Sequence, residues 1–260
     1  MASISDTTGG AHRGRAAPPD LLGGIELIVF DKDGTLIDFQ YMWTGWLAST
    51  TERLEIETGL ALGAELHGLM GVDPASGVVL PHGLLAATPM ARIHERVVDL
   101  LVGRGQPRKE AARAVAAAWR APDPVTLARP VTNLGALFST LRMAGRRLAI
   151  ATTDDRLPTE RTLDALGIAG LIDAVACADD GQPVKPAPDA VLTLCAALGV
   201  PPARTAVVGD APADLRMGRA AGAGRVIGVL TGVGDTATLQ PLADVVLESV
   251  ADLAPSDRTR

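Results

Sequence analysis

Short, nearly continuous apolar runs recur along the chain at 25–30, 148–151, 174–177, 205–209, 225–230 and 244–247. Such runs, rich in β-branched residues, are typical of strands buried on both faces of a parallel sheet. Between them, apolar positions with helical spacing predict helices at about 133–144, 159–167, 187–198 and 212–221, several of which end at glycine. Strands that alternate with helices predict right-handed βαβ units. We therefore expect an α/β fold with an open, doubly wound, Rossmann-like parallel sheet.

The interval 40–129 breaks this alternation. Helical patterns occur in it at about 41–58, 89–103 and 107–119, whereas strand-like runs are few. We expect it to be an inserted helical domain, with 25–39 and 130–260 forming the α/β core. The Pro- and Gly-rich piece 68–83 predicts a loop or a weak hairpin. The insertion also holds all three tryptophans, which we expect to pack in its small core rather than to contact a ligand: Trp43, Trp46 and Trp119.

The first 24 residues are rich in small residues, glycine and proline, and predict a flexible N-terminal arm. They lack the apolar stretch of 7–15 residues that a secretory signal needs. Elsewhere the longest apolar runs are broken by glycine, proline or charge before they reach the roughly 20 residues of a membrane span. The sequence therefore predicts a protein without a membrane partner.

Composition narrows the class of protein further. The 260 residues are 47% hydrophobic and 21% charged, which is typical of a globular chain with a sizeable core. The net charge is −6 and no block of Lys and Arg occurs, so we expect no nucleic-acid partner. Cys177 and Cys195 are too few for a disulfide framework or a four-ligand zinc site, which favours the reducing cytoplasm.

Polar side chains follow three of the predicted strands at the point where each strand ends. Asp31 and Asp33 follow the first run, Thr152 follows the run 148–151, and Asp210 follows the run 205–209. In open α/β sheets the carboxyl ends of the strands form the ligand-binding edge. Carboxylates that converge there repel one another unless a cation is present. The pattern predicts a metal site, a lysine partner, or both.

Hard oxygen ligands without nearby His or Cys favour Mg²⁺. Asp210 and Asp214 are four residues apart, which puts both carboxylates on one side of a first helical turn. Lys185, in the segment PVKPAPD, is the candidate lysine, and the flanking prolines fix its backbone. Each residue also has a structural explanation when taken alone: a solvated surface charge for Lys185 and helix capping for the two aspartates.

Four segments in this order resemble the motifs of the haloacid dehalogenase-like phosphohydrolases: DKDGTL after a strand, a threonine after a second strand, KPAPD, and VVGDAPADLRMGRAAG. The resemblance covers about residues 25–250. An insertion directly after the first motif is similar to the α-helical cap domain of one subgroup of that family. Two positions depart from the family pattern: Thr153, where Asn is common, and Ala211, where Ser or Thr is common.

The resemblance implies a role for each motif residue. Asp31 would be the nucleophile that forms an aspartyl-phosphate, and Asp33 would be the general acid and base. Thr152 would donate a hydrogen bond to the phosphoryl group, while Lys185 would neutralise charge between that group and Asp31. Mg²⁺ would be held by Asp31, the backbone carbonyl of Asp33, and Asp210, with Asp214 as a further ligand or anchor.

The resulting expectation is a Mg²⁺-dependent phosphatase that acts on a small phosphorylated metabolite. The relatives with the most similar motifs and cap position make 2-phosphoglycolate the best substrate expectation. Two alternatives stay open at this point, a sugar-phosphate mutase of the β-phosphoglucomutase type and a non-catalytic module that binds phosphate and Mg²⁺. The sequence contains no information on the oligomeric state.

Overall fold

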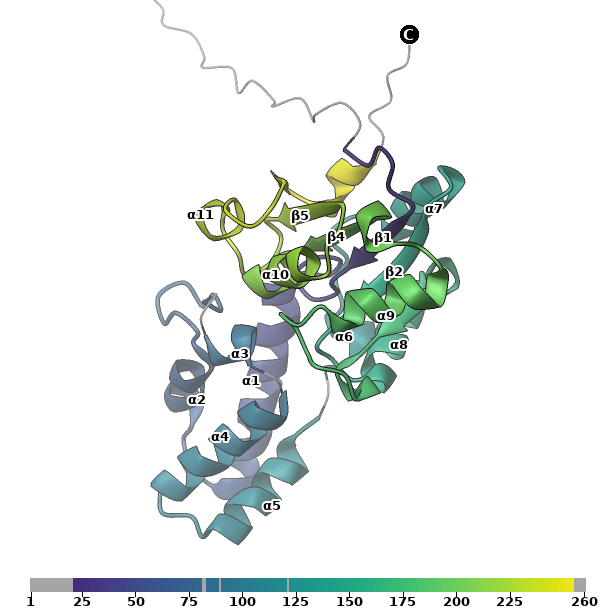
Figure 1. Cartoon of the computed structure of the whole chain (residues 1–260). Coiled ribbons are helices and arrows are strands. Elements are labelled where there is room, and N and C mark those ends of the chain that lie inside the picture. The colour runs from purple at the N-terminus through teal and green to yellow at the C-terminus, as the bar shows by residue number, and fades with distance from the viewer. Residues whose placement is uncertain (1–20, 81–82, 89, 121, 255–260) are drawn as a thin grey trace, which may run out of the picture.

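The computed structural model describes residues 21–80, 83–88, 90–120 and 122–254, and its centre is a six-stranded parallel sheet (Figure 1). The strands are β1 (Leu27–Phe30), β2 (Arg147–Ala151), β3 (Ala174–Ala176), β4 (Thr205–Gly209), β5 (Arg225–Val229) and β6 (Val245–Leu247). Their order, β3-β2-β1-β4-β5-β6, is that of a doubly wound sheet. The predicted fold class is confirmed, and the six predicted strands all lie where the apolar runs placed them.

Helices cover both faces of the sheet (Figure 1): α7 (Leu134–Met143) and α8 (Arg156–Ala165) on one face, and α9 (Asp189–Leu198) and α10 (Pro212–Ala220) on the other. The fully buried strand β1 shows why helices are needed on both faces. Ile28 and Phe30 pack with α7 and α8, whereas Leu27 and Val29 pack with α9 and α10. Because alternate side chains of a strand point to opposite faces, a continuous apolar run requires two covered faces.

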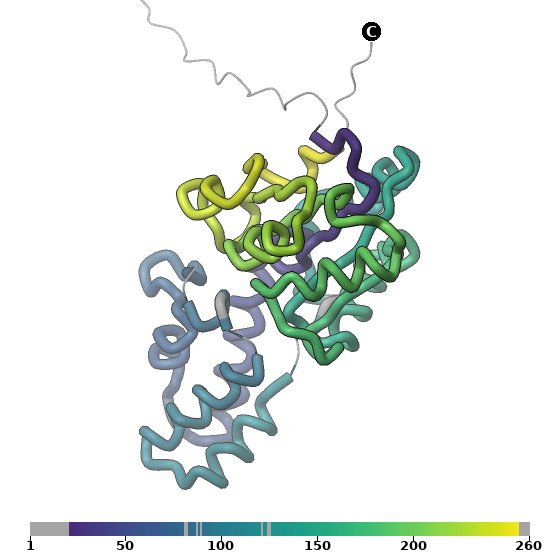
Figure 2. Tube along the Cα trace, in the orientation of Figure 1, coloured from purple at the N-terminus to yellow at the C-terminus, as the bar shows by residue number. Residues whose placement is uncertain are grey.

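The helical segment after β1 packs around a hydrophobic cluster that is distinct from the three clusters beside the sheet and that also includes Ile37 and Val233. Figure 2 shows this body beside the sheet. Its helices are α1 (Phe39–Thr58), α2 (Gly63–Met70), α3 (Leu84–Ala87), α4 (Met90–Gly103) and α5 (Arg108–Ala118). The ring of Trp46 is buried between Trp43 and Trp119, with ring centroids 5.7 and 5.0 Å away. The tryptophans thus build the core of the helical segment.

Two short regions bear on the sequence-based expectation. In the piece 68–83, where a loop or a weak hairpin was expected, the described residues contain the last turn of α2 and an antiparallel bridge between Val72 and Val79. Of the expected N-terminal arm, residues 1–20 lie outside the described residues. The last four, 21–24, form a turn in which Leu22 is buried, and its carbonyl accepts a hydrogen bond from Arg146 at 3.1 Å. Leu22 therefore packs with the hydrophobic cluster of the sheet, whereas Gly24 is exposed.

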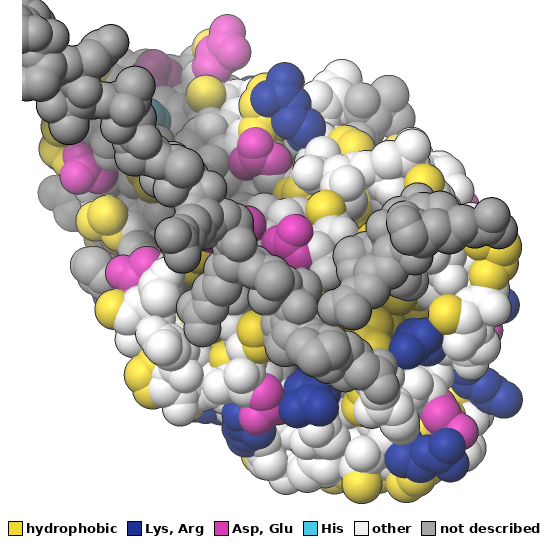
Figure 3. Space-filling view, turned by 90° about the horizontal axis from the view of Figure 1, so that it is seen from above, with side chains coloured by type: hydrophobic (Ala, Val, Ile, Leu, Met, Phe, Trp, Pro, Cys, Tyr) yellow, Lys and Arg dark blue, Asp and Glu magenta, His cyan; other side chains and the backbone are white. Residues whose placement is uncertain are grey.

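The remaining elements are short: α6 (Pro124–Leu127), α11 (Thr236–Leu239), and the 3-10 helices η1 (Ala169–Leu171), η2 (Ala178–Asp180), η3 (Pro202–Arg204) and η4 (Val250–Leu253). Of the helices in the described ranges, none combines the length and the apolar character that a bilayer span requires. Cys177 and Cys195 are both buried and free. On the face seen in Figure 3, basic and acidic side chains of the described residues are interspersed.

Candidate active site

Three of the predicted site residues directly follow neighbouring strands. Asp31 follows β1, Thr152 follows β2, and Asp210 follows β4. β1 pairs in parallel with both β2 and β4, and its last residue is in register with residues near their ends. Parallel strands of matched register end at one edge of the sheet, so the three residues lie at that edge. All three residues are buried.

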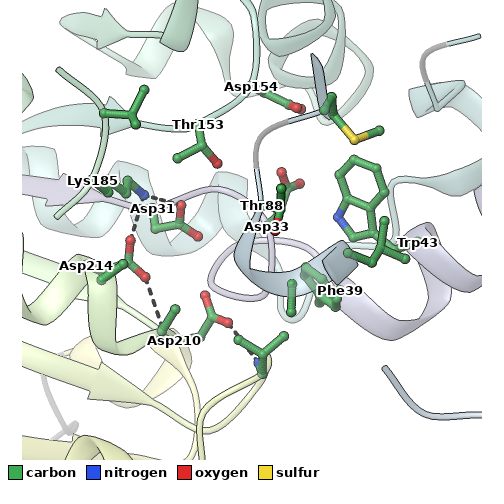
Figure 4. A pocket seen from close by; sticks show the side chains of 17 residues that line it. Asp31, Asp33, Phe39, Trp43, Thr88, Thr153, Asp154, Lys185, Asp210 and Asp214 are labelled. Atoms are coloured by element: carbon green, nitrogen blue, oxygen red, sulfur yellow. Dashed lines mark hydrogen bonds and ion pairs between the residues drawn. The ribbon is translucent and has the colours of Figure 1, made fainter. Parts of the chain in front are cut away.

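Lys185 lies between two of the carboxylates, as Figure 4 shows. Its Nζ is 2.5 Å from Asp31 Oδ1 and 2.7 Å from Asp214 Oδ1. Only 6% of the lysine side chain is exposed, so it is not the solvated surface charge that its sequence alone would allow. Burial by itself would lower the pKa of Lys185, but the charges of Asp214 and Asp31 outweigh it and raise that pKa above its ordinary value. The lysine therefore stays charged between the two acids.

Asp210 is enclosed by backbone and hydroxyl donors. Thr35 Oγ1 donates to its Oδ1 at 3.1 Å, and the Val233 N–H donates to its Oδ2 at 2.9 Å. A Cβ at Gly34 would lie 2.4 Å from Asp210 Oδ2, and the φ of Gly34 is +93°, so only glycine fits there. Burial, followed by the charges of Asp31 and Asp214, raises the pKa of Asp210 well above its ordinary value.

Asp31, Asp210 and Asp214 each offer a carboxylate oxygen, and these atoms all lie within 4.8 Å of one another. Asp214 additionally accepts the Ala211 N–H at 3.0 Å, which fixes it at the start of α10. Lys185 supplies one positive charge for three buried carboxylates, so a residual negative charge is left in the group. Hard oxygen donors with uncompensated negative charge fit a divalent cation such as Mg²⁺.

The side chain of Asp33, the fourth aspartate expected at the metal site, is not part of this group. Its Oδ1 accepts a hydrogen bond from Lys32 Nζ at 2.6 Å, and Lys32 also pairs with Asp154 Oδ2 at 3.0 Å. Burial raises the pKa of Asp33 to about 7, even though the charge of Lys32 acts to lower it. A carboxyl group with a pKa near neutrality can donate and accept a proton.

Sequence reasoning assigned no site role to Lys32 or to Asp154, although the carboxylate of Asp154 pairs with Lys32. The signal that could have revealed the lysine is its place between two aspartates directly after a fully buried strand. A residue at that position has little access to solvent and needs an acidic partner.

Thr152 and Thr153 face different surroundings. The Thr152 hydroxyl is buried and accepts the Asp154 N–H at 3.1 Å, and the Thr152 N–H donates to Ala176 O at 3.0 Å. Thr153, which stands where the resembling family commonly has Asn, lines the site cavity beside Lys185 (Figure 4). Of these two threonines, Thr153 is the one that lines the cavity above the acidic group, whereas Thr152 is not among the lining residues.

A cavity of about 180 Å³ opens over these residues. Its floor carries the aspartates and Lys185, while the opposite wall comes from the helical segment and is mainly apolar: Phe39, Trp43, Leu85, Ala86, Thr88 and Met90. Figure 4 shows Phe39 and Trp43 on the side away from Lys185. The site therefore joins a charged floor suited to an anion and a cation with an apolar wall that belongs to a different hydrophobic cluster.

Residues 25–222 match the family model described as haloacid dehalogenase-like hydrolase. The phosphoglycolate phosphatase of Rhodospirillum rubrum is 31% identical over 176 residues, which are 62% of this chain and 73% of that protein. The phosphoglycolate phosphatase of Aquifex aeolicus is 29% identical over 100 residues, or 38% of this chain. The chain matches only 47% of the length of the Aquifex protein.

Two solved structures share the fold. A protein from Haemophilus somnus, provisionally named a phosphoglycolate phosphatase, superposes with a TM-score of 0.63 at 20% identity and covers 88% of this chain and 96% of its own. A protein from Thermotoga maritima, provisionally named a β-phosphoglucomutase, gives a TM-score of 0.60 at 20% identity, with 88% and 97% covered. Sequence identities this low establish the fold alone, so the reaction has to be inferred from the residues of the site.

Proposed function

Because this chain belongs to the haloacid dehalogenase-like hydrolases and is a phosphoric monoester hydrolase, we propose that it cleaves small phosphorylated metabolites through an aspartyl-phosphate on Asp31. The observation that supports this most is the group of buried carboxylates at the floor of the cavity, with Lys185 between Asp31 and Asp214. A nucleophile needs this kind of orientation before it attacks phosphorus.

In the first step an oxygen of Asp31 attacks phosphorus, and the bond from phosphorus to the alcohol oxygen breaks. Asp33, which lines the same cavity, gives its proton to the departing alkoxide. Its pKa of about 7 supports this role, since the acid is then partly protonated at neutral pH. The products of the step are the free alcohol and the acyl phosphate on Asp31.

In the second step Asp33 accepts a proton from water while the water oxygen attacks phosphorus, and the bond from phosphorus to Asp31 breaks. Lys185 and the hydroxyl of Thr152 would stabilise negative charge on the transferring group in both steps. Phosphate leaves, and Asp31 is again a free carboxylate. One carboxyl group serves as acid and then as base, so each turnover returns it to its starting state.

Asp31, Asp210 and the backbone carbonyl of Asp33 are the residues that would hold Mg²⁺, with Asp214 as an anchor or further ligand. The bound cation would neutralise charge on the phosphoryl oxygens and would lower the repulsion between that group and the nucleophile. The tight enclosure of Asp210 by Gly34 and by the donors of Thr35 and Val233 supports a fixed ligand position.

We further propose that the helical segment, 40–129, acts as a cap over the core formed by 25–39 and 130–260. Trp43, near the start of α1, contributes apolar wall to the cavity, and α3 adds Leu85. An apolar wall over a charged floor excludes water from the transferring group and strengthens the electrostatic contacts below it. The free, buried cysteines support a reducing, cytoplasmic location.

For the substrate, the names of the relatives support 2-phosphoglycolate as the first candidate. The test is phosphate release from a panel of small phosphorylated metabolites, with and without Mg²⁺. We expect release that requires Mg²⁺ and favours one compound.

Sugar phosphates belong in the panel, because interconversion of two sugar phosphates without net release would support a mutase of the kind named for the Thermotoga fold relative. Phosphate bound once per chain without turnover would indicate a binding module and contradict the proposal.

Replacement of Asp210 by Asn should raise the stability of the metal-free protein and weaken the binding of Mg²⁺. The change removes a buried charge that repels Asp31 and Asp214, so we expect the metal-free variant to melt at a higher temperature than the metal-free wild type. Wild-type protein should gain about 2.7 kcal/mol of stability when Mg²⁺ is present at a hundred times its Kd, whereas the variant should gain little. Thermal melting with Mg²⁺ and with a chelator measures both effects. An equal Mg²⁺ shift in both proteins would contradict the assignment of Asp210 as a ligand.

A further inference from the structure

Lys32 stands between the two aspartates of the first motif, yet its side chain is 1% exposed. Lysine is almost never fully buried unless it is paired. Two acids meet its Nζ, Asp33 Oδ1 at 2.6 Å and Asp154 Oδ2 at 3.0 Å. The nucleophile Asp31 is instead paired with Lys185. The site thus contains two buried lysines with separate partners, one at the nucleophile and one at the general acid.

Asp154 is itself fixed in place at the end of β2. Its N–H donates to the Thr152 hydroxyl at 3.1 Å, and its carbonyl accepts the Ala178 N–H at 2.9 Å. A carboxylate on such an anchored backbone gives Lys32 a stationary partner. The ion pair therefore ties the loop after β1, which carries Asp33, to the end of β2, and a buried amine with two acidic partners has little freedom to move.

The contact with Lys32 makes the two carboxylate oxygens of Asp33 inequivalent. Oδ1 is occupied by the lysine, so Oδ2 is the oxygen that can exchange a proton with the leaving group or with water. Asp33 and Asp154 both line the cavity, where the substrate alcohol would leave. Figure 4 shows both of them at the cavity, apart from the group of Asp31, Lys185 and Asp214. Proton transfer requires hydrogen-bond reach to that alcohol, and a displacement of 1 Å can cost about a hundredfold in rate.

Resting on the proposed function, we propose that Lys32 and Asp154 are positioning residues for the general acid. Lys32 holds Asp33 by one oxygen and turns the other toward the leaving group. Asp154 fixes the lysine and balances its charge, so that Asp33 is oriented without facing an unshared positive charge. This assigns a function in the first chemical step to two residues outside the group of potential metal ligands.

A comparison of substrates with different leaving groups distinguishes a positioning role of Lys32 and Asp154 from a merely structural role. An alkyl phosphate ester needs protonation of its alcohol, whereas p-nitrophenyl phosphate departs as a stable anion and needs no acid. The ratio kcat/KM covers only the steps up to departure of the alcohol, so the later hydrolysis of the aspartyl-phosphate does not enter it. For Lys32→Met and Asp154→Asn we expect kcat/KM to fall about tenfold to a hundredfold on the alkyl ester and to stay nearly unchanged on the aryl ester.

Two further variants make the test complete. Asp155→Asn changes the exposed neighbouring acid, which forms no side-chain cap of α8, and should leave both esters unaffected. Asp33→Asn should show the same preference for the aryl ester, and adding Lys32→Met to it should cause no further loss on the alkyl ester, because residues that act as a unit are not additive. If Lys32→Met fails to fold, the nearly isosteric Asp154→Asn still decides the matter.

Equal losses on both esters, or a further tenfold loss when Lys32→Met is added to Asp33→Asn, would overturn the positioning role. So would variants that lose no activity on the alkyl ester. Failure of the proposed function has a different signature: wild-type protein would release no phosphate from either ester with Mg²⁺, and the present inference would fall with it.

Discussion

Replacement of Asp31 by Asn should lower the rate of Mg²⁺-dependent phosphate release at least about a thousandfold, because it removes the oxygen nucleophile on which the reaction depends. Asn keeps the shape of the side chain, and Lys185 retains its contact with Asp214 at 2.7 Å, so the fold should survive. The measurement is steady-state phosphate release on the best substrate of the panel, together with thermal melting to verify folding.

Asp155→Asn is the matched control for this loss, since it makes the same chemical change at an exposed residue near the end of β2. It should retain wild-type turnover. If Asp31→Asn kept more than a tenth of the wild-type rate while remaining folded, Asp31 would not be the nucleophile.

The replacement Lys185→Met should destabilise the fold more than any other single change at the site. It removes the positive charge between Asp31 and Asp214 and leaves three buried carboxylates without a cation. Breaking a buried pair in this way typically costs about 3–5 kcal/mol, because the remaining charge stays buried and uncompensated. We expect a loss of this size in the free energy of unfolding, measured by urea denaturation of metal-free protein at pH 8.

The same variant has a predicted pH dependence. Burial raises the pKa of Asp214 to about 6, although Lys185 acts to lower it, so without the lysine this pKa should rise further. A carboxyl group whose pKa is higher in the folded state adds stability at low pH and loses it as the pH rises through that pKa. The destabilisation of Lys185→Met should therefore be smaller at pH 5.5 than at pH 8.

Lys109→Met provides the control, because Lys109 is an exposed residue in the first turn of α5. Its effect on stability should stay within about 0.5 kcal/mol, as is usual for surface positions. If the two lysine variants unfolded at the same urea concentration, the charge of Lys185 would contribute nothing to the buried site.

Much of the fold could be predicted from sequence because the sheet is buried on both faces. A strand such as Leu27–Phe30, with four buried apolar residues in a row, differs from an amphipathic helix by its continuity. The helices of nine residues or more were also predicted, because a period of 3.6 residues is detectable only over such a length, whereas α2, with eight residues, was not predicted. α3, α6 and α11 have four residues each and carry no such period.

Part of the candidate site was predictable because its residues follow strand ends, while Asp214 and Lys185 were predicted from helical spacing and from their motif. Asp31, Thr152 and Asp210 share that position, and the parallel sheet brings them together. The pairing of Lys32 with Asp154 cannot be predicted from strand ends. Asp154 is far away in the chain, and its orientation depends on the hydrogen bonds around β2. The apolar cavity wall from α1 and α3 depends on how the helical segment packs, which hydrophobic periodicity does not determine.

The central claim is that the phosphoryl group passes through Asp31, and acid-quenched mass spectrometry tests it most directly. Asp33→Asn should slow hydrolysis of the intermediate, so this variant is mixed with p-nitrophenyl phosphate and Mg²⁺, quenched in acid, digested and analysed. We predict one added phosphoryl group on the peptide that contains Asp31, which disappears on a chase and is absent when Asp31 is also replaced by Asn. Phosphate release with no phosphoryl group on that peptide, or with the group on another residue, would contradict the account.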